Sequence, residues 1–241
     1  MRTALSVLAF LLLAITVAQA DEIITTEKVR IKVETFADGL ENPWGLVFLP
    51  DGRALVTERD GRLRFVSSDG KLTSPLDGVP KVDARGQGGL LDVAIDPDFA
   101  KNNFVYLTFS EPGDGSTNST AVARGALTEN GLAGVKVIFS QVPKVASTLH
   151  FGSRIIFDDA GHMFISLGER SKSEFRKQAQ DLSSDLGKVV RLNRDGTIPT
   201  DNPFVGKQGM RSEIWTYGHR NQQGAALNPW SRELWTNEHG P

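Results

Sequence analysis

The chain has 241 residues, with 27 Lys and Arg against 29 Asp and Glu. Its formal charge of −2 argues against a nucleic-acid-binding surface, which needs an excess of basic residues. The sequence contains no cysteine, which excludes disulfides, thiol catalysis and thiolate metal sites.

Residues 1–20 have the pattern of a secretory signal peptide. Arg2 precedes an apolar run that ends at Val17, and the small-residue sequence Ala18-Gln19-Ala20 follows it. A membrane anchor is the alternative, but the run is shorter than the roughly 20 apolar residues that a membrane-spanning helix needs. We therefore expect cleavage after Ala20, a periplasmic or secreted protein without a membrane span, and a mature domain of residues 21–241.

Pairs of apolar runs recur along the rest of the chain and predict β-hairpins. Each pair has a turn between its runs, and the second run ends in a glutamate. The pairs cover residues 46–58, 91–111, 154–169 and 225–238, so their acidic ends are 53, 58 and 69 residues apart. Residues 61–66 and 187–192 have the pattern of a third strand in two of these units. A repeat of this length, with loop insertions, indicates an all-β fold: a β-propeller of four-stranded blades.

The repeat length also predicts how many blades are present. Residues 21–241 make about four blades at roughly 55 residues each, and the last run ends close to Pro241. Because a propeller closes its ring and so protects its strand edges, we expect a C-terminally truncated part of a larger ring. A natural four-bladed propeller is the alternative, and an open edge would also allow a homodimer. Only residues 172–186 have helical spacing, which predicts a short inserted helix.

Two residues near the last hairpin, Arg220 and Asn221, are candidates for binding a ligand. They lie in the segment Tyr217–Gly224, which follows an apolar strand and contains two glycines. A guanidinium offers a planar fork of donors for an oxygen-rich anion, and an amide adds a donor and an acceptor. The alternative is that Arg220 pairs with a carboxylate of a neighbouring blade.

His150 and Glu169 are candidates for proton transfer. His150 precedes the first strand of a hairpin and Glu169 follows the second, so the hairpin brings the two residues to the same end. The carboxylate can then accept a hydrogen bond from one ring nitrogen and leave the other nitrogen as a base. A structural histidine and a solvated glutamate are the alternatives. His162 and His239 are interpreted as turn and strand-end residues.

Gln87, between two glycines, is a further candidate, because glycines let a ligand approach the backbone closely. An ordinary tight loop is the alternative. The sequence has no serine in a nucleophile elbow, no His-Glu-x-x-His and no lysine-containing phosphate loop, which argues against the enzyme classes that depend on them.

Four segments together resemble the soluble sugar dehydrogenases that use pyrroloquinoline quinone, and most closely their periplasmic aldose sugar dehydrogenase branch. The segments are Arg85–Pro97, His150–Arg154, Tyr217–Gly224 and Asn237–Pro241. The resemblance implies a six-bladed propeller with the quinone and Ca²⁺ bound over its central channel. It also implies oxidation of the anomeric hydroxyl of an aldose to a lactone, by hydride transfer to the quinone, with electrons passed to an external acceptor.

The same resemblance implies roles for individual residues. His150 would take the hydroxyl proton and Glu169 would orient its ring, at a position where the family often has aspartate. Arg220 and Asn221 would contact the quinone, and Gln87 would lie near its edge and the substrate. The backbone carbonyls of Gly240 and Pro241 would bind Ca²⁺. The family continues with two further blades, so we expect little activity from this chain alone.

Two other functions are compatible with the sequence. A non-catalytic propeller could bind a carbohydrate or a protein in the same groove. A calcium-dependent lactonase of propeller form would need a cluster of side-chain oxygen ligands, and the sequence shows no convincing set.

Overall fold

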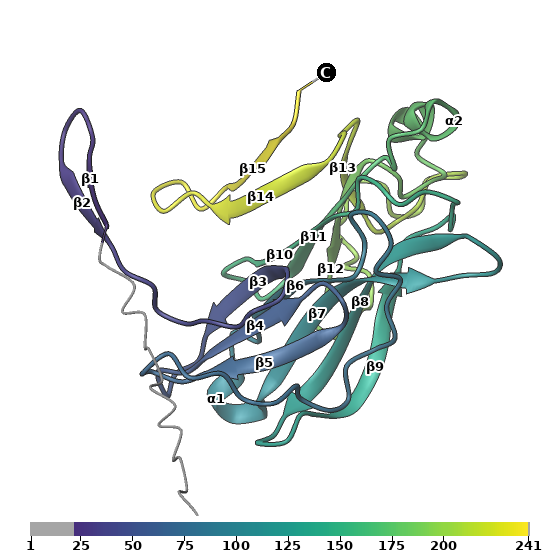
Figure 1. Cartoon of the computed structure of the whole chain (residues 1–241). Coiled ribbons are helices and arrows are strands. Elements are labelled where there is room, and N and C mark those ends of the chain that lie inside the picture. Colours follow the sequence, from purple (N-terminus) through teal and green to yellow (C-terminus); the bar gives the residue numbers. More distant parts are fainter. Residues whose placement is uncertain (1–21, 241) are drawn as a thin grey trace, which may run out of the picture. The chain divides into compact units, whose positions relative to one another are not determined.

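Strands dominate residues 22–240, the part of the chain that the computed structural model describes (Figure 1). The predicted signal peptide and Pro241 lie outside these residues. The chain divides into two compact units, with the boundary after Phe36. The first unit contains one antiparallel hairpin, formed by β1 (Glu22–Thr25) and β2 (Arg30–Val33).

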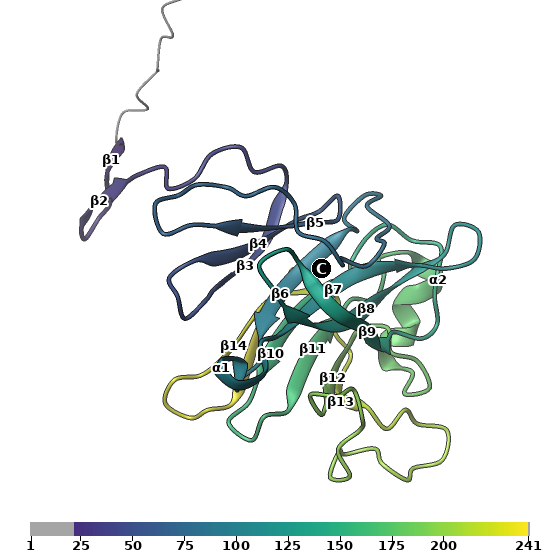
Figure 2. The same cartoon turned by 90° about the horizontal axis from the view of Figure 1, so that it is seen from below.

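The second unit contains four antiparallel sheets that follow one another in chain order (Figures 1 and 2). Their strands are β3 (Pro43–Phe48), β4 (Ala54–Glu58) and β5 (Arg62–Val66) in the first sheet, and β6 (Leu90–Ile95), β7 (Phe104–Pro112), β8 (Asn118–Leu127) and β9 (Leu132–Ser140) in the second. The third sheet has β10 (Gly152–Phe157), β11 (Met163–Leu167), β12 (Lys188–Leu192) and β13 (Ile214–Tyr217), and the fourth has β14 (Gln222–Leu227) and β15 (Leu234–Glu238).

The predicted hairpins and third strands are present in this unit. All four repeated pairs form the first two strands of a sheet, and residues 61–66 and 187–192 contain the third strands β5 and β12. The first strands β3, β6, β10 and β14 are neighbours in that order, as the inner strands of propeller blades are. The second and third sheets have the predicted four strands, whereas the first has three and the fourth has two.

Helices are short throughout residues 22–240. They are α1 (Phe99–Asn102), α2 (Ser173–Arg176) and the 3₁₀ helix η1 (Lys177–Gln180). The last two fall within the predicted helical segment 172–186 but end earlier than its pattern suggests. Asp181 is extended and its carboxylate accepts the N–H of Ser183, which replaces the helical bonding there. No helix in this part of the chain is long and apolar enough to cross a membrane.

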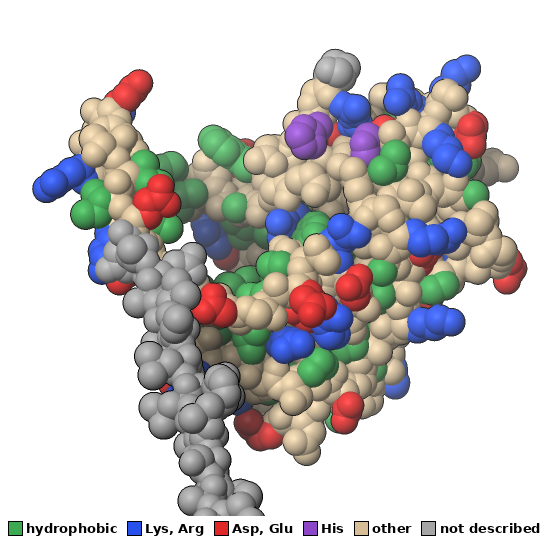
Figure 3. All heavy atoms as spheres, viewed as in Figure 1, with side chains coloured by type: hydrophobic (Ala, Val, Ile, Leu, Met, Phe, Trp, Pro, Cys, Tyr) green, Lys and Arg blue, Asp and Glu red, His purple; other side chains and the backbone are tan. Residues whose placement is uncertain are grey.

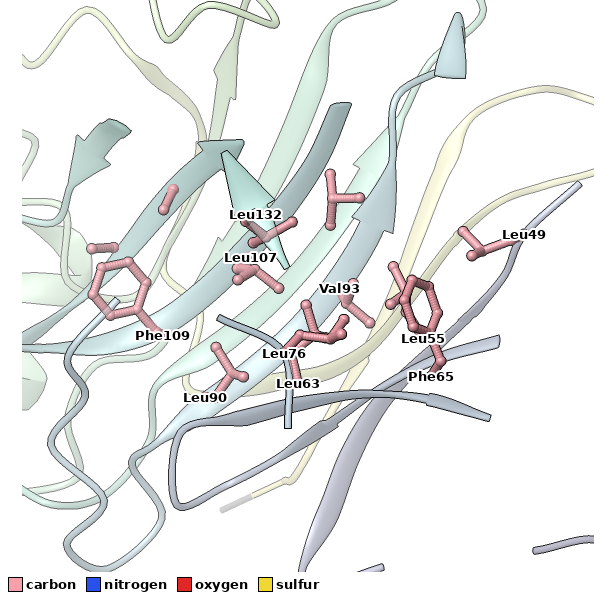
Figure 4. Close-up of a cluster of buried hydrophobic side chains, with 13 residues drawn as sticks. Leu49, Leu55, Leu63, Phe65, Leu76, Leu90, Val93, Leu107, Phe109 and Leu132 are labelled. Carbon is pink, nitrogen blue, oxygen red and sulfur yellow. The ribbon is translucent and has the colours of Figure 1, made fainter. Parts of the chain in front are cut away.

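Apolar side chains fill the spaces between the first three sheets. One cluster joins the first sheet, through residues such as Leu55 and Phe65, to Val93 and Leu107 of the second (Figure 4). A second cluster joins Tyr106 to the apolar face of β10 and β11. Lys, Arg, Asp and Glu side chains are interspersed over the face seen in Figure 3. The first three sheets are therefore held together by apolar burial on both sides of the second sheet.

Each of the four first strands has a β-bulge near its start. The register shifts between Pro43 and Leu46, and the corresponding shifts begin at Leu90, Gly152 and Gln222. A bulge bends a strand and changes the direction of its side chains, and bulges are common beside functional sites. Here the bulge is repeated at the start of all four first strands in residues 22–240.

A buried hydroxyl fixes three of these bulges and also links each sheet to the next. The hydroxyls of Thr57, Thr108 and Ser166, all on second strands, accept the bulge N–H groups of Gly45, Asp92 and Arg154 at 2.8, 2.8 and 3.0 Å. The same hydroxyls donate to carbonyls on the following first strand, those of Leu91, Ser153 and Gln222, at 2.5, 2.7 and 3.2 Å. We call these three residues the hydroxyl belt.

Arg154 connects its own sheet to the other three sheets through charged, polar and aromatic contacts. Its Nη1 donates to Asp92 Oδ1 at 3.0 Å, its Nε donates to the Gln223 carbonyl at 2.7 Å, and its guanidinium lies 4.3 Å from the centre of the Trp44 ring. Burial raises the pKa of Asp92, although Arg154 opposes that effect. One side chain on β10 thus contacts the first strands of the other three sheets.

The hydroxyl belt predicts a specific loss of stability. Thr108→Val keeps the shape of the side chain but leaves the Asp92 N–H and the Ser153 carbonyl without their shared partner. We expect the free energy of unfolding to fall by about 1–3 kcal/mol, because buried polar groups without a partner keep their desolvation cost. Urea unfolding measures this change.

Thr117→Val is the control, since its hydroxyl donates to the Asp114 carbonyl within an exposed turn. Its effect should stay within about 0.5 kcal/mol. Equal effects of the two substitutions would show that the belt does not hold the sheets together.

Candidate functional site

A cavity of about 380 Å³ lies where the four first strands begin. It is lined by the bulged starts of these strands and by the loops beside them: Trp44, Arg59, Gln87, Leu91, His150, Phe151, Gly152, Arg220, Asn221, Gln223, His239 and Gly240. The structure therefore brings together Gln87, His150, Arg220, Asn221 and Gly240, which come from four separate segments. Glu169 does not line this cavity and lies behind His150.

His150 and Glu169 make the contact that the hairpin predicts. Nδ1 of His150 lies 3.0 Å from Oε2 of Glu169, and the two side chains are 13% and 4% exposed. The backbone N–H of Ser171 also donates to this carboxylate oxygen. A Cβ at Gly168 would come within 1.9 Å of the His150 carbonyl, so only glycine permits this approach of loop and strand.

The free ring nitrogen of His150 is available for chemistry. Glu169 accepts a hydrogen bond from Nδ1 when that nitrogen carries the proton, which leaves Nε2 unprotonated in the neutral ring. No residue from 22 to 240 pairs with Nε2, and His150 lines the cavity. The arrangement can therefore accept a proton from a molecule in the cavity and stabilise the resulting imidazolium.

Gln87 lies in a tight loop that also contacts the His150 loop. Its side-chain oxygen accepts the N–H of His150 at 2.9 Å, and its own N–H donates to the Thr148 carbonyl at 2.8 Å. A Cβ at Gly86 would lie 2.6 Å from that carbonyl, so the flanking glycine is needed for close packing. Gln87 thus supports His150 and still lines the cavity.

Arg220 and Asn221 are held through their backbone, which leaves their side chains for other contacts. Their N–H groups donate to Oε2 of Glu238 at 2.6 and 3.0 Å. Among residues 22–240 no carboxylate pairs with the Arg220 guanidinium, so the alternative of a neighbouring-blade ion pair is not found there. Asn221 Oδ1 accepts the Gly152 N–H and the Gln223 amide, each at 3.0 Å. The NH₂ group of Asn221 is therefore the part of its side chain that can donate a hydrogen bond to a ligand.

The lining of the cavity is positively charged. Arg59 and Arg220 contribute this charge, and among residues 22–240 no Asp or Glu lines the cavity. The Arg59 guanidinium also donates hydrogen bonds to the carbonyls of Gly86 and Gly88. These bonds hold the loop that contains Gln87. A cavity with this lining suits an oxygen-rich anion.

The metal site stays a prediction, and only one of its two predicted ligands can be located. Gly240 lines the cavity, and Pro241 lies outside the described residues. Within the described part of the chain no group of three His, Cys, Asp or Glu could hold a metal ion. A cation here would therefore depend on backbone carbonyls and on oxygens of the ligand itself.

Sequence reasoning missed several residues of the site. Trp44 and Arg59 line the cavity because a bulge and a tight loop aim them there, and neither feature has a clear sequence pattern. His239 does follow a strand, as interpreted, but it also lines the cavity. Glu238, which holds the backbone of Arg220 and Asn221, could have been found from the sequence. It occupies the repeated acidic position at the end of a second strand.

Comparisons with known proteins point to one family. Residues 40–241 match the family model described as Glucose / Sorbosone dehydrogenase. The Escherichia coli protein named aldose sugar dehydrogenase YliI is 48% identical over 214 residues, which is 88% of this chain and 57% of that protein. The chain thus spans a little over half the length of this relative.

Solved structures agree with this match. A glucose dehydrogenase crystal structure is 50% identical with a TM-score of 0.83, covering 86% of this chain and 60% of that one. A PQQ-bound aldose sugar dehydrogenase from Streptomyces coelicolor is 32% identical with a TM-score of 0.76, covering 87% of this chain and 60% of its own. These similarities confirm the predicted β-propeller fold, and the number of blades stays a prediction.

Glu238 gives a pH-dependent prediction. Burial would raise the pKa of Glu238, but the N–H groups of Arg220 and Asn221, with His219, outweigh burial and lower it. A lowered pKa stabilises the fold above the unfolded value of 4.5, and that stability is lost as the pH falls through the folded pKa. We expect Glu238→Gln to reduce the free energy of unfolding by about 1 kcal/mol at pH 7 and by less near pH 4.

Urea unfolding at both pH values measures the difference between the two chains. Glu233→Gln, at an exposed position of the same hairpin, is the control and should show no such pH dependence. A constant difference between wild type and Glu238→Gln would contradict the assignment.

Proposed function

Because the chain belongs to the glucose/sorbosone dehydrogenase family, we propose that its cavity is the site of a pyrroloquinoline quinone-dependent oxidation of aldoses to lactones. The proposal rests mainly on one cavity that is lined by both His150 and Arg220. Among residues 22–240, Nε2 of His150 and the Arg220 guanidinium have no side-chain partner. The chain spans 57% of its Escherichia coli relative, so the activity of the whole protein is part of the proposal.

The residues present fit the proposed cofactor. Pyrroloquinoline quinone is flat, oxygen-rich and anionic, and the Streptomyces coelicolor relative is described as PQQ-bound. The cavity volume of about 380 Å³ is within the usual range for small-ligand sites. Arg220 and Asn221 would hold the group with a planar fork and an amide, and Gln87 would lie at its edge.

When bound, the quinone supplies the acceptor for the hydride that leaves the anomeric carbon. His150 Nε2 removes the proton of the anomeric hydroxyl, and Glu169 holds the ring and stabilises its positive charge. Loss of the proton and the hydride leaves a carbonyl, which is the lactone. The Arg220 guanidinium provides positive charge beside the site, and one such donor is typically worth about 3 kcal/mol of barrier.

Ca²⁺ is the second proposed cofactor. Gly240 lines the same cavity as Arg220 and His150, so a metal held by its carbonyl would lie in the site proposed for the anionic quinone. Its carbonyl and that of Pro241 are proposed ligands, because Ca²⁺ prefers hard oxygen donors. The bound quinone would supply further oxygens.

The remaining parts of the proposal concern the setting of the reaction. An aldose is the substrate, and an external acceptor takes the electrons. The signal-peptide pattern of residues 1–20 supports a periplasmic or secreted location. A homodimer is proposed only as one way to cover the edge of the last sheet.

Two substitutions test this function in the mature chain. With quinone and Ca²⁺ added, Arg220→Met should weaken quinone binding at least tenfold, because it removes a charged hydrogen-bonding group. His150→Gln should leave binding within about threefold but slow sugar-dependent bleaching of the quinone by about 10²–10⁴-fold, the usual effect of a general base. Stopped-flow absorbance gives both values, and their ratio to wild type is the readout.

Removing Ca²⁺ with a chelator should also weaken quinone binding. Arg232→Met, which breaks an exposed pair with Asp159, is the control and should change neither value. A folded chain that binds no quinone would contradict the proposal. Detectable bleaching at the same rate in wild type and His150→Gln would also contradict it. Binding of sugar alone would instead favour a non-catalytic propeller.

A further inference from the structure

Arg170, which directly follows Glu169, is a buried cation with an unusual set of partners. Its side chain is fully buried, and it makes no ion pair with any carboxylate among residues 22–240. Its guanidinium lies 3.9 Å from the centre of the Phe151 ring. Burial lowers its pKa to about 10, although Asp83 and Glu169 oppose that effect. Burying a charged side chain without a carboxylate partner costs free energy, so its contacts should show what the side chain contributes.

The partners of Arg170 lie in the loop that leads to His150. Nε donates to the Leu149 carbonyl at 2.9 Å, and Nη2 donates to the Ser147 carbonyl at 2.6 Å. In return, the Ser147 hydroxyl donates to the backbone carbonyl of Arg170 at 2.7 Å. The side chain also donates to the carbonyl and the side-chain oxygen of Asn118, on β8. Arg170 therefore fastens the His150 loop to the second sheet.

The peptide group between Leu149 and His150 is held at both of its polar atoms. Arg170 holds the carbonyl oxygen, and the Gln87 side chain holds the N–H at 2.9 Å. His150 has a positive φ of 50°, which few residues other than glycine adopt without such support. We propose, building on the proposed function, that Arg170 is a positioning residue: it fixes the backbone of His150 so that the imidazole faces the cavity.

The backbone around Arg170 supports this role. Arg170 and Ser171 both have left-handed conformations, with φ of 71° and 66°. This turn directs the Arg170 side chain inward and returns the Ser171 N–H to the Glu169 carboxylate. Such conformations are costly and are found where surrounding contacts enforce them, often at functional sites. Three consecutive residues thus support His150. Glu169 contacts its ring, Arg170 bonds to the peptide carbonyl that precedes it, and Ser171 holds the Glu169 carboxylate.

Nuclear magnetic resonance of the histidine rings tests the proposal without any cofactor. The sequence has four histidines, and His150→Gln assigns the signals of His150. In the wild type we expect one set of His150 signals, with the proton on Nδ1. In Arg170→Met and in Arg170→Lys these signals should shift or broaden, because the loop loses the fork that holds two carbonyls. His162, on a distant turn, should be unchanged.

Arg170→Lys keeps the positive charge, so the same measurement can be made on it if Arg170→Met does not fold. Arg191→Met is the matched control, since Arg191 is also a buried arginine over an aromatic ring, that of Trp215. It should lower stability without moving the His150 signals. With quinone and Ca²⁺ added, the Arg170 variants should slow bleaching about 10- to 100-fold and keep quinone binding within about threefold.

Wild-type His150 signals in either folded Arg170 variant would overturn the proposal. A His150 response as strong in Arg191→Met would also overturn it, because that result would indicate a general loss of structure. If no chain binds quinone, the ring signals still decide the role of Arg170, so failure of this inference and failure of the proposed function can be told apart.

Discussion

The hydroxyl belt is the constraint on which the rest of this structure depends. Thr57, Thr108 and Ser166 are buried, and each satisfies two backbone groups that a bulge would otherwise leave without a partner. One of these groups belongs to the hydroxyl's own sheet and the other to the next sheet. The belt therefore fixes the bulges and the spacing of the sheets together, and the starts of the first strands meet around one cavity.

A second repeated feature, a glutamate at the end of a second strand, holds the loops around that cavity. The glutamates at the ends of three second strands, Glu58, Glu169 and Glu238, reach back to the loop that enters the same sheet. Their partners differ: the N–H of Glu41, the ring of His150, and the N–H groups of Arg220 and Asn221. In the first sheet this contact only holds a loop. In the third sheet the same geometry holds the ring of His150, the proposed base, and in the fourth it holds the backbone of Arg220.

Much of this could be predicted from the sequence, because the repeat is regular. The hairpins, the third strands and the pairing of His150 with Glu169 all follow from where a strand begins and its partner ends. The resemblance brought Gln87, Arg220 and Asn221 to the same site. By contrast, Trp44, Arg59 and Arg170 depend on a bulge, a tight loop and two left-handed residues. Those conformations are imposed by packing between sheets, which local sequence does not encode.

We propose that the cavity around His150 is the quinone site, and a crystal structure of the mature chain with pyrroloquinoline quinone and Ca²⁺ would show whether the quinone binds there. We expect density for the quinone in this cavity, in contact with the Arg220 guanidinium and facing His150 Nε2. An empty cavity in a well-ordered crystal, or quinone bound elsewhere on the molecule, would contradict it.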